Sequence, residues 1–441
     1  MLFLTIIFFI MFLVFQIFYI IVPFFTMRKV ELNKDFEEKG ITVIIPAYNE
    51  ELVIKNCINS SLAVDYSNYE ILIVNDGSKD STMNILKDYL DLEYTTKKRA
   101  NKLDYKYIRG IYKSKLYENV YLIDKDNGGK ADALNAGIDY SSNELVVTLD
   151  ADSMLEKDSL RYMNQYFEDK DIVAAGGTVN VVQSVDVNGD NITYKFKGKN
   201  IIKHQMLHYI HGFYVKKSTQ SLFNSMIVIS GAFGIFKKDI LFNVKGFRHT
   251  VGEDMDITLK IHKYIKENNL KKKLVYVPEA ICYTECPENF KNFYNQRIRW
   301  QKAFIDCVVE YWGSLFKDLK SPLSAFMAFD GFLLGTMSVF FTLMMPIVLV
   351  LTKDGYMIAI VLILAAIIFD FLQNIEALIV CRKYGVKFSW SDYVKIIFFM
   401  VYERFTYKLV PLILNSVGTI RYFLDDDRWS YIERKGEVSI V

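Results

Sequence analysis

Apolar and polar residues divide the chain into three zones. Residues 2–25 form an uncharged apolar run that is long enough to cross a bilayer, which takes ~20 residues. From residue 40 to about residue 277, short runs of Ile, Val and Leu alternate with helical stretches. Long apolar segments return after residue 332. This pattern predicts a water-facing domain that is flanked by membrane segments.

The middle zone is predicted to be an α/β domain. Its apolar runs are bounded by Asn, Asp and Gly, as buried parallel strands are, and helical stretches such as 51–62 and 81–89 lie between them. The series predicts a Rossmann-like, mostly parallel sheet, which binds ligands at the carboxyl ends of its strands. The expected strands are 42–46, 71–75, 120–123 and 145–149.

The third zone begins with a predicted amphipathic helix. Apolar residues recur at helical spacing after Gln296, with charged residues between them, which favours a helix on the membrane surface over one packed on its own domain. Two spans are predicted at 332–351 and 357–380. A third apolar region, 393–423, contains charged residues and fits either one tilted crossing or a tight hairpin.

The expected organisation is a multi-pass protein of the plasma membrane with a cytosolic catalytic domain. Arg28 and Lys29 follow the first run, and basic residues prefer the cytoplasmic side. A signal peptide is the alternative, but no basic residue precedes the run. The predicted parts are an N-terminal transmembrane helix (1–26), a cytosolic domain (27–290), interface helices (291–322), C-terminal transmembrane helices (323–424) and a tail (425–441).

Composition agrees with this division and excludes one class of partner. Hydrophobic residues make up 51% of the chain and charged residues 24%, which fits apolar spans beside a charged domain. The 53 basic and 51 acidic residues nearly cancel, so no basic excess exists to bind nucleic acid. The five scattered cysteines predict free thiols, and a metal pair at Cys282 and Cys286 is the weaker alternative.

Two polar motifs follow the first two predicted strands. The first is Pro46-Ala47-Tyr48-Asn49-Glu50, where a strand that stops in a polar loop can lay an aromatic ring against a flat base. The second begins with Asn75-Asp76-Gly77, in which the strand presents Asp76 at its tip. A carboxylate there can bind uracil or ribose hydroxyls. A capped turn explains the residues after Asp76, with Asp80 or Ser81 capping the next helix.

The third motif predicts an anion site. Gly128 and Gly129 precede Lys130, which opens a helix, so backbone donors, the helix dipole and an ammonium group can meet a diphosphate. The spacing differs from that of a P-loop.

The fourth motif, Asp150-Ala151-Asp152, follows the predicted strand 145–149 directly. Alternate residues of an extended segment point the same way, so both carboxylates can face one ligand. They repel each other unless a cation lies between them. Mg²⁺ or Mn²⁺ that bridges carboxylate and diphosphate oxygens would resolve this repulsion.

Two further motifs lie near the third zone. Gly252-Glu253-Asp254 predicts a general base, with helix capping by either carboxylate as an equal alternative. Gln296-Arg297-Ile298-Arg299-Trp300 places an amide, a guanidinium and an indole on one helix, where Arg299 can neutralise diphosphate and Trp300 can stack on a sugar.

In this order, the motifs resemble the inverting family 2 glycosyltransferases of GT-A fold. Within that family they look like the membrane-integrated processive synthases of cellulose, hyaluronan, chitin oligosaccharides and poly-N-acetylglucosamine. The D-x-D motif and the Q-x-x-R-W motif carry most of the resemblance, which extends from the first span to the last.

The resemblance implies a role for each matching residue. Asp254 is the expected catalytic base and Asp152 the expected ligand of Mg²⁺ or Mn²⁺. Ser230, Gly231 and Trp300 are expected to bind the acceptor. The residues expected to bind the nucleotide and donor are Ala47, Tyr48, Glu50, Asp76, Lys130, Asp150, Gln296 and Arg299.

The expected activity is processive transfer from UDP-glucose or UDP-N-acetylglucosamine to a growing β-linked polysaccharide that crosses the membrane. Membrane lipid and accessory export proteins are further expected partners. Asp370, Glu376, Glu403 and Arg404 are predicted to include residues that line the polymer path, with snorkelling as the alternative for the last two.

Three alternatives stay open. One is a lipid glycosyltransferase that adds a single sugar, and another is a sensor with an inactive catalytic fold, although all expected carboxylates are present. The last concerns His204, His208 and His211, which share a helical face. They are predicted to face water or lipid headgroups, with a metal site as the less favoured hypothesis.

Overall fold

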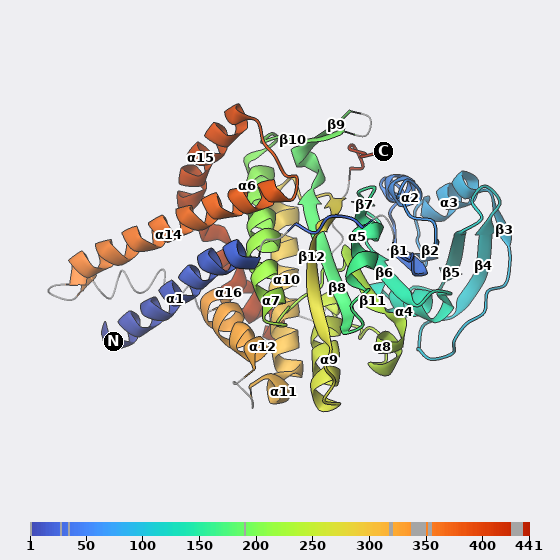
Figure 1. The fold of residues 1–441 in the computed structure, drawn as a ribbon, viewed down its shortest axis with the longest axis horizontal. Helices are drawn as coiled ribbons and strands as arrows, with labels where there is room; N and C mark the ends of the chain where they lie inside the picture. The colour runs from blue at the N-terminus through green and yellow to red at the C-terminus, as the bar shows by residue number, and fades with distance from the viewer. Residues whose placement is uncertain are drawn as a thin grey trace.

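The computed structural model describes residues 2–26, 29–33, 36–188, 191–316, 321–336, 350–351, 355–424 and 435–441. A ten-stranded sheet forms one end of the molecule, and apolar helices extend from the other end (Figure 1). The strand order is β3-β4-β5-β2-β1-β6-β11-β8-β12-β7. The strands β4, β7 and β11 run opposite to the rest, so the sheet is mostly parallel, as predicted.

Four neighbouring parallel strands form one half of the sheet's interior, and all four were predicted. They are β1 (Ile41–Ala47), β2 (Tyr69–Asn75), β5 (Val120–Lys125) and β6 (Leu145–Leu149). β1 pairs with β2 and with β6, and β2 pairs with β5. Their Ile, Val and Leu side chains are buried on both faces, as they must be in a sheet that helices cover on both sides. The loops after these strands therefore meet at one edge.

The remaining strands extend the sheet on both sides. They are β3 (Leu92–Tyr94), β4 (Ile108–Ser114), β7 (Ser153–Leu155), β8 (Ile172–Val181), β11 (Phe233–Lys237) and β12 (Lys273–Thr284). A separate hairpin pairs β9 (Val185–Asn188) with β10 (Asn191–Tyr194). The helices of this part include α2 (Ile54–Leu62), α3 (Thr82–Leu90), α4 (Lys130–Tyr140), α5 (Ser159–Tyr166), α8 (Lys238–Asn243) and α9 (Glu253–Glu267).

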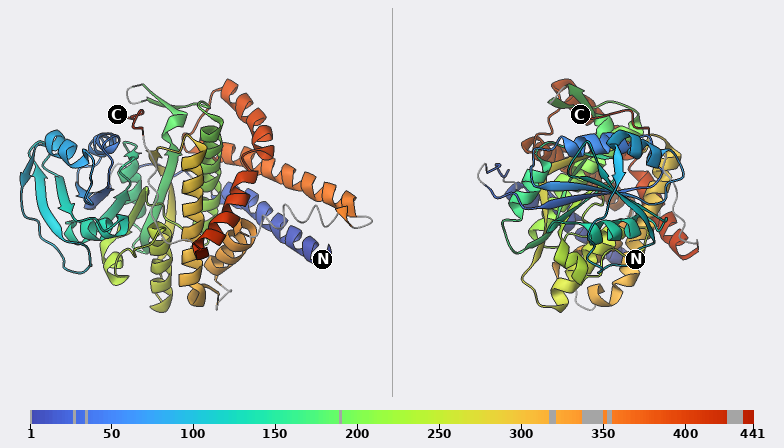
Figure 2. Two further views of the ribbon diagram at one scale, coloured as in Figure 1. Left: turned by 180° about the vertical axis from the view of Figure 1, so that it is seen from behind. Right: turned by 90° about the vertical axis from the view of Figure 1, so that its right-hand side faces the viewer.

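Two long helical segments stand between the sheet and the apolar end (Figure 2). One is α6 (Asn200–Ile210), which continues as a π-helix (His211–Lys217) and then as α7 (Ser218–Leu222). The other is α10 (Phe290–Glu310), which the Asn289 side chain caps by accepting a hydrogen bond from the Asn292 N–H. The short α11 (Trp312–Phe316) follows it.

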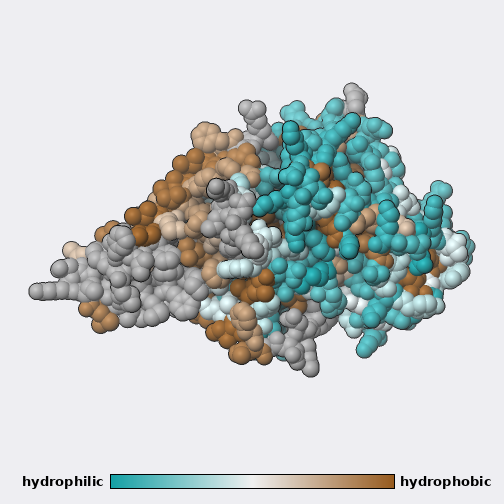
Figure 3. All heavy atoms as spheres, turned by 90° about the horizontal axis from the view of Figure 1, so that it is seen from below, coloured by the Kyte–Doolittle hydropathy of each residue, from teal (hydrophilic) through white to brown (hydrophobic). Residues whose placement is uncertain are grey.

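The apolar end contains α1 (Leu2–Thr26), α14 (Gly355–Lys383), α15 (Trp390–Phe405) and α16 (Leu409–Leu424). The short α12 (Pro322–Ala325) and a π-helix (Phe326–Thr336) lead towards it. Hydrophobic residues gather on the surface of this end, whereas hydrophilic residues cover the sheet end (Figure 3).

The helices test the predicted membrane segments only in part. Within the described ranges, one helix, Ile363–Lys383 in α14, is long and apolar enough to cross a membrane by length and composition. Shorter apolar helices cover Phe9–Phe25, Pro322–Leu333 and Leu409–Leu424. Most of the predicted span 332–351 lies outside the described residues. The region 393–423 forms two helices with a break at 406–408 and is not one continuous helix.

Candidate active site

Two loops at the carboxyl edge of the sheet are joined by hydrogen bonds. The Asn49 N–H donates to Ser78 Oγ at 3.0 Å, and the Lys79 N–H donates to Asn49 Oδ1 at 2.8 Å. The Glu50 N–H donates to Thr82 Oγ1 at 2.8 Å. These bonds hold the half-buried Tyr48 and Glu50 beside the tip of β2, where the sequence predicted a nucleoside site. Ser81 is the N-cap residue of α3 but makes no cap bond with its side chain, whereas Asp80 Oδ1 accepts a bond from the Thr82 N–H at the start of the helix.

Asp76 is buried at the tip of β2, and four donors surround its carboxylate. Oδ1 accepts from Lys125 Nζ at 2.6 Å and from the Gly128 N–H at 3.0 Å. Oδ2 accepts from the Gly129 N–H at 2.8 Å and from Asn127 Nδ2 at 3.1 Å. A carboxylate offers about four acceptor sites. A ribose or uracil group could therefore reach Asp76 only by displacing one of these donors.

This arrangement corrects one part of the predicted anion site. The backbone donors of Gly128 and Gly129 bind the Asp76 carboxylate, so they do not point towards an incoming diphosphate. The positive φ of Gly129, +88°, gives the turn its shape. The N-terminal end of α4 and the Lys130 ammonium are the parts of the prediction that remain.

Lys130 lies at the centre of the remaining charged groups. Its Nζ is 2.6 Å from Asp150 Oδ1 and 2.8 Å from Glu253 Oε1. Burial alone would lower the pKa of Lys130, but the two carboxylates raise it above its ordinary value. The structure therefore brings together Lys130 from α4, Asp150 from the end of β6 and Glu253 from α9. Glu253 does not cap its helix, because the N-cap residue is Gly252.

Asp254 lies beside this group, next to the loop that precedes β11. The Gly231 N–H donates to Asp254 Oδ2 at 3.3 Å. A methyl group on Gly231 would come within 2.8 Å of Lys130 Nζ and 3.5 Å of Asp254 Cβ, so Gly231 allows the two side chains to approach. Burial raises the pKa of Asp254, and the Glu253 carboxylate raises it further. An aspartate with a raised pKa suits proton abstraction near neutral pH.

Asp152 fits the predicted metal ligand by its chemistry. Its Oδ1 accepts hydrogen bonds from the Ser153 and Thr284 hydroxyls, both at 3.3 Å, which orient the buried carboxylate. Among the described residues, no group of three or more His, Cys, Asp or Glu side chains could hold a metal ion. Mg²⁺ characteristically binds one or two carboxylates together with substrate phosphates, and Asp150 and Asp152 could supply such a pair.

The structure ties α10 to α9, the helix that carries Asp254, but the contacts lie beyond the Q-x-x-R-W residues. Arg248 donates to Asp256 Oδ1 on α9 at 2.8 Å and to Asp306 Oδ2 on α10 at 2.5 Å. A methyl group on Gly252 would approach Ala303 Cβ to 2.3 Å, so the two helices touch there. The placement of Gln296, Arg299 and Trp300 around the donor and acceptor, like that of Ser230, stays a prediction.

Sequence reasoning missed three charged residues that form ion pairs near the site. They are the buried Lys125 and the partly exposed Arg248 and Asp306. A lysine at the end of an apolar strand was the available signal for Lys125. The partners of these residues are distant in sequence, which local patterns do not reveal.

The histidine prediction was wrong for His204. Its side chain is buried, and its Nδ1 lies 3.3 Å from Glu403 Oε2. Its ring stacks on that of Tyr407, with 5.4 Å between the ring centroids. Glu403 is 1% exposed, which excludes snorkelling for this residue. Lys408 bridges Glu403 and Asp370, because its Nζ lies 3.6 Å from Glu403 Oε1 and 2.5 Å from Asp370 Oδ1. Asp370 of α14 and Glu403 of α15 therefore face polar partners. Both carboxylate oxygens of Glu376 on α14 are instead buried without a hydrogen-bond partner among the described residues.

The family assignment follows from the site and the fold together. The chain matches the glycosyl transferase family 2 over residues 42–242 and the glycosyl transferase family group 2 over residues 145–416. Because the second match spans more than half of the chain, the protein belongs to the family 2 glycosyltransferases.

The chain is also similar to curated relatives within the family. The chain is 29% identical over 300 residues to the poly-beta-1,6-N-acetyl-D-glucosamine synthase of Staphylococcus aureus (strain COL), covering 67% of this chain and 62% of the relative. The synthase of the same name from Staphylococcus epidermidis is 29% identical over 281 residues, covering 63% and 58%. The chain thus spans about three fifths of the length of these relatives.

A solved structure confirms the predicted fold. The mannosyltransferase from Pyrobaculum calidifontis, in complex with GDP-Man and Mn²⁺, superposes with a TM-score of 0.55 at 15% identity, covering 93% of this chain and 95% of that one. At this identity the similarity establishes the GT-A-like α/β fold alone.

Proposed function

We propose that this protein is a membrane-embedded, inverting glycosyltransferase that extends a β-linked polysaccharide from a UDP-sugar. UDP-N-acetylglucosamine is the favoured donor, because the relatives are named as synthases of that polymer. The observation that carries the proposal is the meeting of Lys130, Asp150, Glu253, Asp254 and Gly231 at the carboxyl edge of the sheet.

The proposed reaction is a single in-line displacement. Asp254 removes the proton from the acceptor hydroxyl as its oxygen attacks the anomeric carbon, and the bond to the nucleoside diphosphate breaks. Inversion of an α-linked donor produces a β-linkage. Lys130 and Arg299 stabilise the charge that develops on the departing diphosphate. A bound Mg²⁺ or Mn²⁺, held by Asp152 with Asp150, would neutralise part of the same charge.

The acceptor and the polymer are assigned to the helical side of the site. Trp300 is 38% exposed, so its ring is accessible to stack on an acceptor sugar. The buried pair His204–Glu403 and the partly exposed pair Lys408–Asp370 are proposed to lie along the path by which the polymer leaves. Apolar α1 and α14 would anchor this end in the membrane (Figure 3).

A product assay tests the proposal. The full chain is purified in detergent and incubated with radiolabelled UDP-N-acetylglucosamine or UDP-glucose and either Mg²⁺ or Mn²⁺. We expect a high-molecular-weight product that requires the divalent cation, together with release of UDP. A product of one sugar on lipid would establish the single-addition alternative, and no turnover of either donor would refute the proposal.

A further inference from the structure

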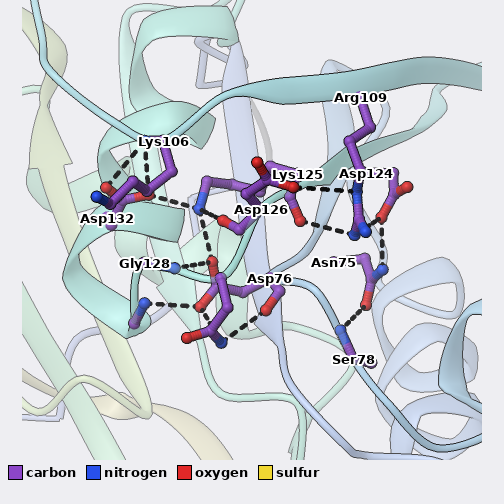
Figure 4. A network of polar contacts seen from close by, with 12 residues as sticks. Asn75, Asp76, Ser78, Lys106, Arg109, Asp124, Lys125, Asp126, Gly128 and Asp132 are labelled. Carbon is purple, nitrogen blue, oxygen red and sulfur yellow. Dashed lines mark hydrogen bonds and ion pairs between the residues drawn. The ribbon is translucent and has the colours of Figure 1, made fainter.

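Lys125, the last residue of β5, is a fully buried cation (0% exposed). Its Nζ lies 2.6 Å from Asp76 Oδ1, 2.5 Å from Asp132 Oδ1 and 2.6 Å from the Asp126 carbonyl oxygen (Figure 4). An ammonium group has three donors, and these three acceptors use all of them. Pairing with two carboxylates offsets the cost of removing the charge from water.

The carboxylates of Asp76 and Asp132 hold the two ends of the turn 127–130. Asp76 accepts from the backbone N–H groups of Gly128 and Gly129, which precede α4. Asp132 lies in the first turn of α4, and its two oxygens accept from the Lys106 N–H at 3.1 and 3.0 Å. Lys130 lies between these attachment points. Lys125 thus connects, through its two anionic partners, the start of the turn with the first turn of the helix.

Removal of the Lys125 charge would leave Asp76 and Asp132 without their shared counter-ion. Two carboxylates in close proximity repel each other unless a cation separates them. They would therefore move apart or attract another cation, and either change would displace the turn that carries Lys130. The effect on a ligand would follow from the altered position of Lys130.

We propose that Lys125 is a positioning residue for the sugar donor. It acts through Asp76 and Asp132 to set the turn 127–130, so that Lys130 meets the diphosphate of the nucleotide. It makes no contact with the ligand itself. The inference rests on the proposed function, because it assumes a nucleoside diphosphate at Lys130.

A second buried lysine provides a matched control. Lys97 Nζ lies 2.7 Å from Glu70 Oε2 and donates to Ser142 Oγ at 2.7 Å, and both charged side chains are 9% exposed. Glu70 is at the start of β2 and Asp76 follows the end of the same strand. Substitution of either lysine breaks a buried ion pair with β2, but only Lys125 connects to the turn before Lys130.

The experiment compares Lys125→Met with Lys97→Met in the full chain in detergent. The dissociation constant of UDP in the presence of Mg²⁺ is measured by calorimetry, and the thermal midpoint is measured in parallel. Both variants should have a lower midpoint. Only Lys125→Met should weaken UDP binding, by about tenfold, or about 1.4 kcal/mol. The double variant Lys125→Met/Asp132→Asn should bind UDP more tightly than Lys125→Met, because one of the two facing carboxylates is removed.

The outcomes separate this inference from the proposed function. Wild-type protein that does not bind UDP overturns both. Wild-type protein that binds UDP, together with unchanged affinity in Lys125→Met or an equal loss in Lys97→Met, overturns the positioning role alone. Where Lys125→Met does not fold, Asp132→Asn decides: a loss of about threefold in UDP affinity supports the role, and unchanged affinity overturns it.

Discussion

The candidate site has a donor side, around Asp76 and Lys125, and an α10 side, around Gln296 and Arg297. The two sides differ in how they accommodate buried polar groups. On the donor side, Asp76 and Lys125 have a partner at every position, and all of these partners belong to the chain itself. On α10, Gln296 Oε1 and the Nε and Nη2 atoms of Arg297 are buried and have no hydrogen-bond partner within the described part of the chain. Native proteins leave few buried polar atoms in that state.

The difference indicates which side is complete before a ligand arrives. A network whose partners are all internal holds one geometry, because any movement breaks several bonds together. Unsatisfied amide and guanidinium groups have no such constraint. The guanidinium carbon of Arg297 instead lies 4.2 Å from the ring centroid of Trp300 and 4.9 Å from that of Phe293. Cation–π contacts therefore hold Arg297 in place. We expect hydroxyl groups of an acceptor sugar to satisfy the Arg297 atoms, and the bound donor to satisfy Gln296 Oε1.

The largest expected effect concerns Asp254, which lies between the two sides. Asp254→Asn should lower the rate of transfer by about 10²–10⁴-fold, since it removes the general base. UDP binding should persist, because the donor-side network is unchanged. Glu267→Gln, at the exposed far end of α9, is the control and should leave the rate unchanged. Radiolabel incorporation measures the rate, and a fully active Asp254→Asn variant would refute the assignment.

The same variant should also be more stable at neutral pH. Because the folded-state pKa of Asp254 is raised, its contribution to stability is full at low pH and is lost as the pH rises through that pKa. Asparagine carries no charge to bury. We therefore expect a higher thermal midpoint for Asp254→Asn at pH 7, with a smaller difference from wild type at acidic pH. An unchanged midpoint at pH 7 would argue against the raised pKa.

Gly231→Ala should produce the next largest change. The added methyl group would lie 2.8 Å from Lys130 Nζ, which Asp150 and Glu253 hold in place. Overpacking of this kind costs about 1–3 kcal/mol, and we expect the KM of the donor to rise about tenfold. Gly212→Ala is the matched control, since a methyl group there would meet no atom within 4 Å. Equal donor KM values in the two variants would contradict the expected role of the loop.

Arg297→Met distinguishes the two sides directly. A buried polar group without a hydrogen bond lowers the stability of the folded protein by about 1–3 kcal/mol, so its removal is stabilising. The loss of the cation–π contacts offsets part of that gain. The thermal midpoint should therefore be no lower than that of wild type, whereas Lys125→Met should lower it. The KM of the acceptor should rise several-fold and that of the donor should stay the same. A large loss of stability would show that Arg297 is a structural partner like Lys125.

The smallest expected effect is a shift in the pH profile. The acid limb of kcat/KM for the donor should follow the ionisation of Asp254, because the base acts only when it is deprotonated. Glu253 raises the pKa of Asp254, so Glu253→Gln should lower that pKa and move the limb to lower pH. The profile is measured for wild type and variant under identical conditions. A shift to higher pH would contradict the charge arrangement.

Local patterns in the sequence predicted the central strands and the residues at their tips. The run 145–149 became β6 with the same bounds, and Asp150 follows it directly. Such strands are predictable because they are buried on both faces and end in polar turns. The helix α1 was predicted for a similar reason, since an apolar run of that length has few other structures available to it.

The sequence alone therefore predicted the central strands of the sheet, the first apolar helix and the candidate residues of the site. Only the tertiary structure decided how those residues are paired. It directed the amides of Gly128 and Gly129 to Asp76, placed Lys125 between two carboxylates and buried His204 against Glu403. The physical reason is distance along the chain. Propensity and periodicity act over a few residues, whereas the partners of a buried charge come from whichever elements the fold brings beside it.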